Sequence, residues 1–199
     1  MKDDFSKKMQ KRRRAHVLGL FVFLLCWFVP IAVPAADDAV VVESAATHLN
    51  GGVYELNAMV RMTLPVKVVD ALESGVPIVF ELQLKVGQGR WYWLDKMIVE
   101  KSQRYRLYYH AFTRQYLLKD LNSGIQRNYL TLQDAITGFT SISNYPLLDA
   151  EALKPDTYYE AQLRLLLDRK LLPAALRANA LLDSNWYVQS DWFAWGVTE

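Results

Sequence analysis

Strict alternation of apolar and polar side chains is the feature that most constrains the fold of this chain. Over residues 78–86 every second side chain is a large apolar one, and three of the four positions between them are charged or carry an amide. Side chains of a β-strand point alternately to opposite faces, so this period of two predicts a strand buried on one face only. The same alternation recurs over 54–62 and 159–167. Half-buried strands of this kind are typical of antiparallel sheets.

Helix and turn signals connect these strands. Thr63, followed by Pro65, predicts the capped start of a short helix that Gly75 ends. Thr131 with Asp134 three residues later predicts a start like a capping box for a second short helix. Further small and polar residues predict turns in three places, namely 87–89, 102–103 and 122–124.

The order of these signals predicts the fold class. Hairpin-length connections dominate, and no series of alternating strands and helices indicates a parallel sheet. We therefore expect a mainly β fold, an antiparallel β-sandwich or open barrel with about seven or eight strands and two short helices. It would form a single β-rich domain over 40–199. In this interpretation 141–155 is a loop, a connecting segment begins at Leu171, and the last strand covers 186–195.

The first 36 residues have the composition of an export signal. Seven Lys and Arg side chains and two Asp side chains precede an uncharged run over 17–33, and small residues follow at 35–36. A basic start, an apolar middle and a small-residue exit are the pattern of a secretory signal peptide. We therefore expect residues 1–36 to direct export and the domain that follows to be periplasmic.

The alternative is that the same apolar run is not cleaved and serves as a membrane anchor. Its 17 residues are at the short limit of a membrane-spanning helix, which needs about 20 residues, and Pro30 would disturb its last turn. If it is retained, residues 17–33 would hold the protein in the inner membrane with its domain facing the periplasm. A lipoprotein signal is not expected, because Leu25 rather than a small residue precedes Cys26.

Charge and cysteine content narrow the partners. Of 23 basic and 21 acidic side chains in the whole chain, seven and two lie in the leader, so 16 and 19 remain in the domain. Binding to nucleic acid needs a basic face on the folded domain, so we expect no nucleic-acid partner. Cys26 is the single cysteine of the chain and lies in the leader. The domain is thus expected to fold on its core alone, with no disulfide, metal or cofactor.

Residues with catalytic potential are few. Outside the leader, His48 and His110 have no partner at a spacing that suits a metal site or a catalytic pair. Asp95 and Asp168 each follow apolar strand residues and lie near arginines. They could act as an acid and a base if the fold brought them together; capping of turns or pairing with arginine is the other interpretation. We expect no catalytic, cofactor or metal site.

Aromatic side chains are the clearest excess in the sequence. Eight lie between residues 91 and 116, and five lie between 186 and 195. We assign Trp91 and Trp93 to the core, which leaves Arg90 and Tyr92 on the outer face of the same strand. These two residues and Tyr108 are candidate surface contacts. Outward aromatic and arginine side chains are typical of protein-binding hot spots and can stack on sugars, whereas cross-strand pairing would be purely structural.

Four groups of residues have a characteristic order: Asp70-Ala71-Leu72 with Gly75 and Phe80; Arg90-Trp91-Tyr92-Trp93-Leu94-Asp95 with Arg106-Leu107 and Thr113-Arg114-Gln115-Tyr116; Thr131-Leu132 with Ala135; and Arg164-Leu165 with Asp168, Leu172-Pro173, Trp186, Ser190 and Trp192. In these the chain resembles, over about residues 50–195, the bacterial exported family called domain of unknown function 4390. The resemblance implies an exported protein, whose gene often lies beside one for a sensor histidine kinase of the nitrogen-regulation type. No catalytic residues are assigned to that family, so the resemblance implies none here.

Three hypotheses for function follow, in order of preference. The first is a non-enzymatic envelope domain that contacts an envelope or membrane protein, in its concrete form as an accessory to a membrane sensor kinase. The second is a module that binds glycan or lipid through an aromatic sheet face. The third is an enzyme that uses carboxylates.

For the leader, we predict cleavage after Ala35 or Ala36, because Val33 and Ala35 suit the small-residue positions before a cut. N-terminal sequencing of the protein from the envelope fraction should therefore begin at Ala36 or Asp37. A membrane-bound chain that still begins at Met1 would contradict this prediction and favour the anchor.

Overall fold

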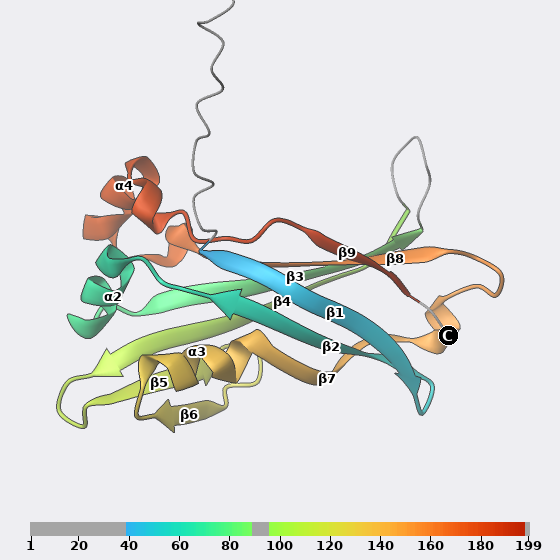
Figure 1. Cartoon of the computed structure of the whole chain (residues 1–199), viewed down its shortest axis with the longest axis horizontal. Helices are drawn as coiled ribbons and strands as arrows, with labels where there is room; N and C mark the ends of the chain where they lie inside the picture. The colour runs from blue at the N-terminus through green and yellow to red at the C-terminus, as the bar shows by residue number, and fades with distance from the viewer. Residues whose placement is uncertain (1–38, 89–95, 198–199) are drawn as a thin grey trace, which may run out of the picture. The chain divides into compact units, whose positions relative to one another are not determined.

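Two antiparallel β-sheets make up most of the domain (Figure 1). The computed structural model describes residues 39–88 and 96–197. The small sheet has the strand order β1-β2-β7, formed by β1 (Val40–Asn50), β2 (Val53–Met62) and β7 (Ser141–Asp149). The large sheet has the order β6-β5-β4-β3-β8-β9, formed by β3 (Ile78–Gln88), β4 (Lys96–His110), β5 (Gln115–Asp120), β6 (Gln126–Tyr129), β8 (Tyr159–Leu167) and β9 (Phe193–Val197).

Strand β3 lies at the centre of the large sheet, between β4 and β8. Its even-numbered side chains from Ile78 to Val86 are fully buried, as the alternation predicts. In β8 the odd-numbered side chains from Tyr159 to Leu167 stand opposite them and are buried on the same face. In β2 the even-numbered side chains from Tyr54 to Met62 supply the facing wall. The core is the layer between the two sheets, and the expected sandwich is confirmed.

Helix α3 (Leu132–Thr140) covers the part of the large sheet that the three strands of the small sheet do not cover. The large sheet is twice as wide in strand number as the small one, so part of its inner face needs another cover. Helix α3 supplies it near β5 and β6, and its Phe139 ring stacks on that of Phe80 with the centroids 5.2 Å apart. The predicted cap at Thr131 is confirmed, because Thr131 Oγ1 accepts a hydrogen bond of 3.1 Å from the Asp134 amide.

Helix α2 (Val66–Glu73) lies at one end of the domain, and its start differs from the prediction. Pro65 is the N-cap and no side chain caps the helix. The amide of Thr63 instead donates a 2.8 Å hydrogen bond to the carbonyl of Ala39, so Thr63 extends the pairing of β1 with β2. Gly75 follows the helix with a φ of +85°, a conformation that suits glycine, as expected for a stop.

Four sequence predictions are wrong in detail. Ser102 and Gln103 do not turn the chain, because both continue the pairing of β4 with β3. The predicted loop over 141–155 contains β7, which pairs with β2. The connecting segment contains helix α4 (Ala174–Leu182), and the last strand covers Phe193–Val197 rather than 186–195. The described residues thus form nine strands and three α-helices, where seven or eight strands and two helices were expected.

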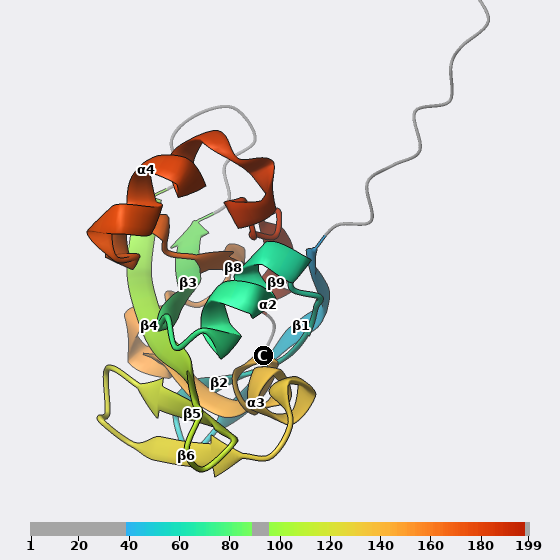
Figure 2. The same cartoon turned by 90° about the vertical axis from the view of Figure 1, so that its left-hand side faces the viewer.

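Short 3-10 helices complete the chain: η1 (Ala150–Ala152), η2 (Arg169–Leu171) and η3 (Ser184–Trp186). Helices α2 and α4 lie at the same end of the domain (Figure 2). Asp37–Glu199 forms one compact unit. None of the helices in the part of the chain that the structure describes is long and apolar enough to cross a membrane. The predicted core positions Trp91 and Trp93, and the leader, lie outside the described residues.

Helix α3 approaches β6 closely at Gly138, and this generates a prediction. A Cβ added at Gly138 would lie 2.8 Å from Cζ of Tyr129 and even nearer to its hydroxyl. We expect Gly138→Ala to lower the free energy of unfolding by about 1–3 kcal/mol through overpacking. Adding Tyr129→Phe should recover part of the loss by removing the hydroxyl. Chemical denaturation measures both, and Gln133→Ala on the exposed face of α3 is the control, expected within about 0.5 kcal/mol of the parent. Equal stability of Gly138→Ala and the parent would contradict the close contact.

Candidate functional site

The outer face of the large sheet is the first candidate surface. We define it as the side chains of β3, β4 and β8 that point away from the small sheet. Most of them are polar or charged and half-buried or exposed: Gln83, Lys85, Ser102, Arg104, Arg106, Gln162 and Arg164. Alternation places them there, because their neighbours in each strand face the core. The face is therefore an open, polar surface.

Trp192 adds a large aromatic side chain to this face. It precedes β9, and its ring centroid lies 4.5 Å from Cζ of Arg164 and 4.8 Å from Nζ of Lys85. A cation this close to an indole ring is attracted by the negative charge of the ring face. Arg164 also donates two hydrogen bonds to Oε1 of Gln83, from Nε at 3.2 Å and from Nη2 at 2.6 Å. The half-buried Trp192 ring is thus held against a fixed guanidinium group.

Several other charges on the outer face are paired within the sheet. Glu81, which is nearly buried, accepts a hydrogen bond from the Ser102 hydroxyl and lies 3.7 Å from Nη2 of Arg104. Lys85 lies 3.8 Å from a carboxylate oxygen of Glu100 on the adjacent strand. These pairs join β3 to β4. Arg164 with Trp192 combines a fixed guanidinium group with a large aromatic ring, and this makes it the group best suited to contact another molecule.

The predicted surface residues lie apart from this group or outside the described residues. Tyr108 is on the outer face, as expected, and stands directly opposite Leu117 of β5. Leu117 is buried although it points outward, so Tyr108 adjoins an apolar position. In β4 Tyr108 is eight residues from Glu100, or about 26 Å at the rise of a strand, so it is remote from Trp192. Arg90 and Tyr92 lie outside the described residues. The sequence analysis included Trp192 in the aromatic excess but did not assign it to a face. It placed residue 192 within a strand over 186–195, whereas β9 begins only at Phe193.

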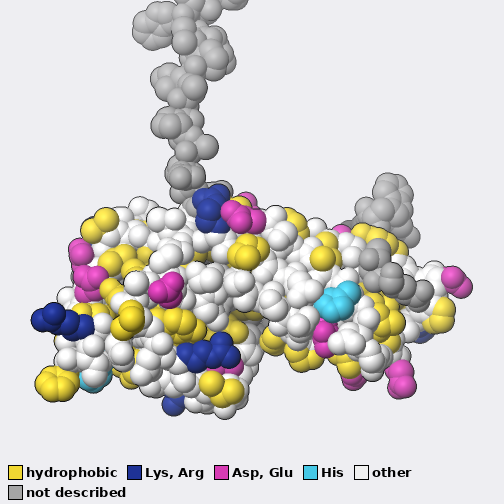
Figure 3. All heavy atoms as spheres, turned by 60° about the horizontal axis from the view of Figure 1, so that its bottom comes forward, with side chains coloured by type: hydrophobic (Ala, Val, Ile, Leu, Met, Phe, Trp, Pro, Cys, Tyr) yellow, Lys and Arg dark blue, Asp and Glu magenta, His cyan; other side chains and the backbone are white. Residues whose placement is uncertain are grey.

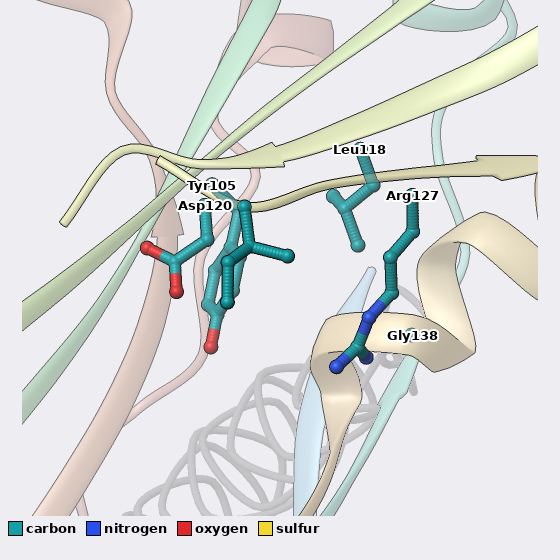
Figure 4. Close-up of a pocket in the computed structure, with 6 residues that line it drawn as sticks. Tyr105, Leu118, Asp120, Arg127 and Gly138 are labelled. Carbon is teal, nitrogen blue, oxygen red and sulfur yellow. The ribbon is translucent and has the colours of Figure 1, made fainter. Parts of the chain in front are cut away.

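A small pocket on the inner side of the large sheet is the second candidate (Figure 4). It has a volume of about 110 Å³ and lies where β4, β5 and β6 meet α3. Its lining combines a carboxylate, a phenol and a guanidinium with apolar side chains, from Tyr105, Leu118, Asp120, Ile125, Arg127 and Gly138. In Figure 4 the Asp120 carboxylate and the Tyr105 hydroxyl lie on one side of the pocket, and the Arg127 guanidinium lies on the other.

Asp120 serves the fold at this pocket. Its Oδ1 accepts hydrogen bonds from Gln103 Nε2 at 2.5 Å and from the amides of Asn122 and Ser123 at 2.8 and 3.1 Å. Burial by itself raises the pKa of Asp120, but the hydrogen bonds from Ser123, Asn122 and Gln103 outweigh it and hold the pKa below its ordinary value. The carboxylate therefore stays ionised and organises the turn between β5 and β6.

Tyrosines around Asp120 stay protonated. Burial, and then the charge of Asp120, raise the pKa of Tyr105 to about 12. The same two causes raise the pKa of Tyr145 on β7. At neutral pH these three groups therefore present a fixed negative charge and two neutral hydroxyls. This arrangement suits hydrogen bonding better than proton transfer, which works best for groups that titrate near the working pH.

The remaining sequence candidates have local structural roles. His48 lies 3.4 Å from Glu55 and 3.2 Å from the Asn57 amide nitrogen, on an exposed part of the small sheet. His110 accepts a 3.3 Å hydrogen bond from the Thr113 amide in the turn after β4.

Asp168 caps η2, because its Oδ1 accepts a 2.9 Å hydrogen bond from the Lys170 amide. The capping interpretation is therefore correct for Asp168, whereas Asp95 lies outside the described residues. Over 39–88 and 96–197 no three potential ligands gather as a metal site would require.

The face that carries α3, β6 and β7 shows charges of both signs scattered among apolar side chains (Figure 3). Neither sign gathers into a large patch there. This surface therefore offers no strong field for a highly charged partner.

Asp120 generates a testable prediction. Asp120→Ala should lower the free energy of unfolding at neutral pH by about 1–3 kcal/mol, because it leaves the buried Gln103 amide without its acceptor. Since folding lowers the pKa of Asp120 from 3.8, its ionised form stabilises the fold above about pH 4 and this contribution is lost as the pH falls.

The stability difference between the parent and Asp120→Asn should accordingly narrow below pH 4 in denaturant titrations. Asp156→Asn, in an exposed loop, is the control and should follow the parent curve. A constant difference from pH 7 to pH 3 would contradict the assignment.

Comparison with known proteins identifies a family. The family model described as domain of unknown function (DUF4390) matches residues 37–196, which confirms the resemblance found in the sequence. Neither the curated proteins nor the solved structures contain a significant match. Because the family match covers most of the chain, the protein belongs to the family of the domain of unknown function DUF4390.

Proposed function

We propose that this protein is an exported, non-enzymatic interaction domain of the bacterial envelope that binds another envelope or membrane protein. The binding surface is the outer face of the large sheet around Trp192. The observation that carries the proposal is the half-buried Trp192 ring, packed against Arg164 and Lys85 on an otherwise polar sheet. The leader sequence supports export, and the gene context that the family resemblance implies supports a membrane sensor kinase as the partner.

Composition favours a protein partner at this surface. Tryptophan and arginine are the residues most enriched at the energetic centres of protein interfaces. Here the two are in contact, and two hydrogen bonds to Gln83 fix the Arg164 guanidinium. A group that is already ordered loses less conformational entropy when it binds, so more of its interaction energy contributes to affinity.

A glycan ligand is supported less well by the same geometry. Sugars stack on a free aromatic face, whereas two cations already lie within 5 Å of the Trp192 ring centroid. A sugar that stacked on a ring face occupied by one of these cations would have to displace it and lose its cation–π attraction. A protein partner can instead contact the ring edge and the guanidinium together.

The test is capture of partners from native envelope by the tagged full-length protein. We expect Arg164→Ala and Trp192→Ala each to weaken the main partner by about 2 kcal/mol, or about 30-fold, the usual size of a hot-spot loss. Tyr108→Ala, on the same face but remote from Trp192, is the matched control and should keep the partner. Thermal unfolding of each variant separates lost binding from lost folding.

Two results would contradict the proposal. One is full capture by a folded Arg164→Ala protein, since the guanidinium would then contribute nothing. The other is binding of the purified protein to a polysaccharide that Trp192→Ala abolishes, which would favour the glycan hypothesis.

A further inference from the structure

The end of the domain where the chain enters also contains helices α2 and α4. The carbonyl of Ala39, just before β1, accepts the amide of Thr63 at 2.8 Å, and α2 begins three residues after Thr63. Lys67 in the first turn of α2 forms a 2.6 Å ion pair with Asp183, which follows α4 directly. Chain entry, the start of α2 and the end of α4 therefore lie together, and we name this region the α2–α4 end (Figure 2).

Large apolar side chains are exposed at the α2–α4 end. Next to the two partners of the ion pair, Val66 is 74% exposed and Leu182 is 91% exposed, and Leu181 is 60% exposed. Tyr187 lies next to this patch. The Arg169 guanidinium lies over the Tyr187 ring and donates a hydrogen bond to the carbonyl of Ala180, which precedes Leu181 in α4. Apolar side chains gathered in this way on a folded domain mark a contact with a protein or a membrane.

The covalent connection to the leader favours a membrane. Position 33, the last of the apolar run, lies only six residue steps before Ala39. Six residues span at most about 20 Å even when fully extended. While the run lies in a bilayer, the chain therefore holds Ala39, and with it the start of α2, within reach of the headgroups. This constraint acts during export whether or not the leader is cut afterwards.

We propose that the α2–α4 end is a lipid-contact surface, which rests on the bilayer with Val66, Leu181 and Leu182 inserted among the headgroups. Aliphatic side chains gain free energy by leaving water, and a tyrosine such as Tyr187 suits the interface between headgroups and water. This inference rests on the export that the proposed function assumes, but the surface uses none of the residues of the proposed partner site around Trp192. Partner capture and lipid binding can therefore fail separately.

The charges of this end predict how binding depends on lipid. Helices α2, η2 and α4 and the two aspartates that flank them carry four basic and four acidic side chains, and Lys67 is paired with Asp183. The basic ones are Lys67, Arg169, Lys170 and Arg177, and the acidic ones are Asp70, Glu73, Asp168 and Asp183. Basic and acidic groups therefore largely offset one another, and attraction to anionic headgroups contributes little. Binding should depend mainly on the apolar side chains and only weakly on lipid charge.

Flotation with vesicles tests the proposal on residues 37–199, which form one compact unit with its own core. We expect this domain to float with vesicles of phosphatidylethanolamine and phosphatidylglycerol. Its partition coefficient on phosphatidylcholine vesicles should lie within about threefold of that value. The double variant Leu181→Ser/Leu182→Ser should lower the partition coefficient by about tenfold or more. Its thermal unfolding should match the parent, because both side chains are exposed in the folded domain.

Leu49→Ser is the matched control. Leu49 is also exposed, at 47%, but lies at the far end of β1, and its variant should float like the parent. Three results would overturn the lipid surface: no flotation on any vesicle, an equal loss in Leu49→Ser, or binding that needs native membranes with their proteins. The last would assign the α2–α4 end to a protein partner.

Discussion

The double pairing of β3 is the interaction on which the rest of the domain depends. This strand is hydrogen-bonded to β4 along one edge and to β8 along the other, and its row of apolar side chains from Ile78 to Val86 forms the centre of the core. A slip of one residue in either register would turn that row to the solvent face. Because the inner row is fixed, the outer row is fixed too. The positions of Gln83 and Lys85, and so the place where Arg164 meets Trp192, follow from it.

The unequal width of the two sheets explains the polar interior near α3. Three strands bury the middle of the large sheet, but β5 and β6 extend past them, and α3 covers this part with the Phe139 ring. At this margin the inward row of β4 changes from Leu107 and Tyr105 to Gln103, and Asp120 stands opposite Tyr105. Gln103 and Asp120 satisfy each other by a hydrogen bond, so their burial carries little penalty. The pocket beside them is thus a consequence of how two layers of different size meet.

Sequence reasoning succeeded where one physical signal dominated and failed where tertiary contacts overrode local composition. The strands with clean alternation, β2, β3 and β8, were predicted within a residue or two. Strand β7 was missed because its segment is polar and contains Pro146, which an edge strand tolerates. The polar pair at 102–103 suggested a turn. Gln103 is instead buried in a strand, because Asp120, 17 residues away, accepts its hydrogen bond, and local composition does not reveal this contact. The site was hardest to find, since the outward orientation of Trp192 depends on two cations from other strands.

The place of Trp192 just before β9 has a mechanical consequence. Strand β9 is a short edge strand of five residues, paired to β8 alone, and such strands open more readily than central ones. The contacts of Trp192 with Lys85 and Arg164 pin the start of this strand onto β3 and β8. A molecule that binds the Trp192 ring in this position would stabilise the conformation in which β9 is paired with β8, since binding favours the conformation it recognises. Occupancy of the outer face would then be transmitted, through rigidity rather than displacement, to the C-terminal edge of the sheet.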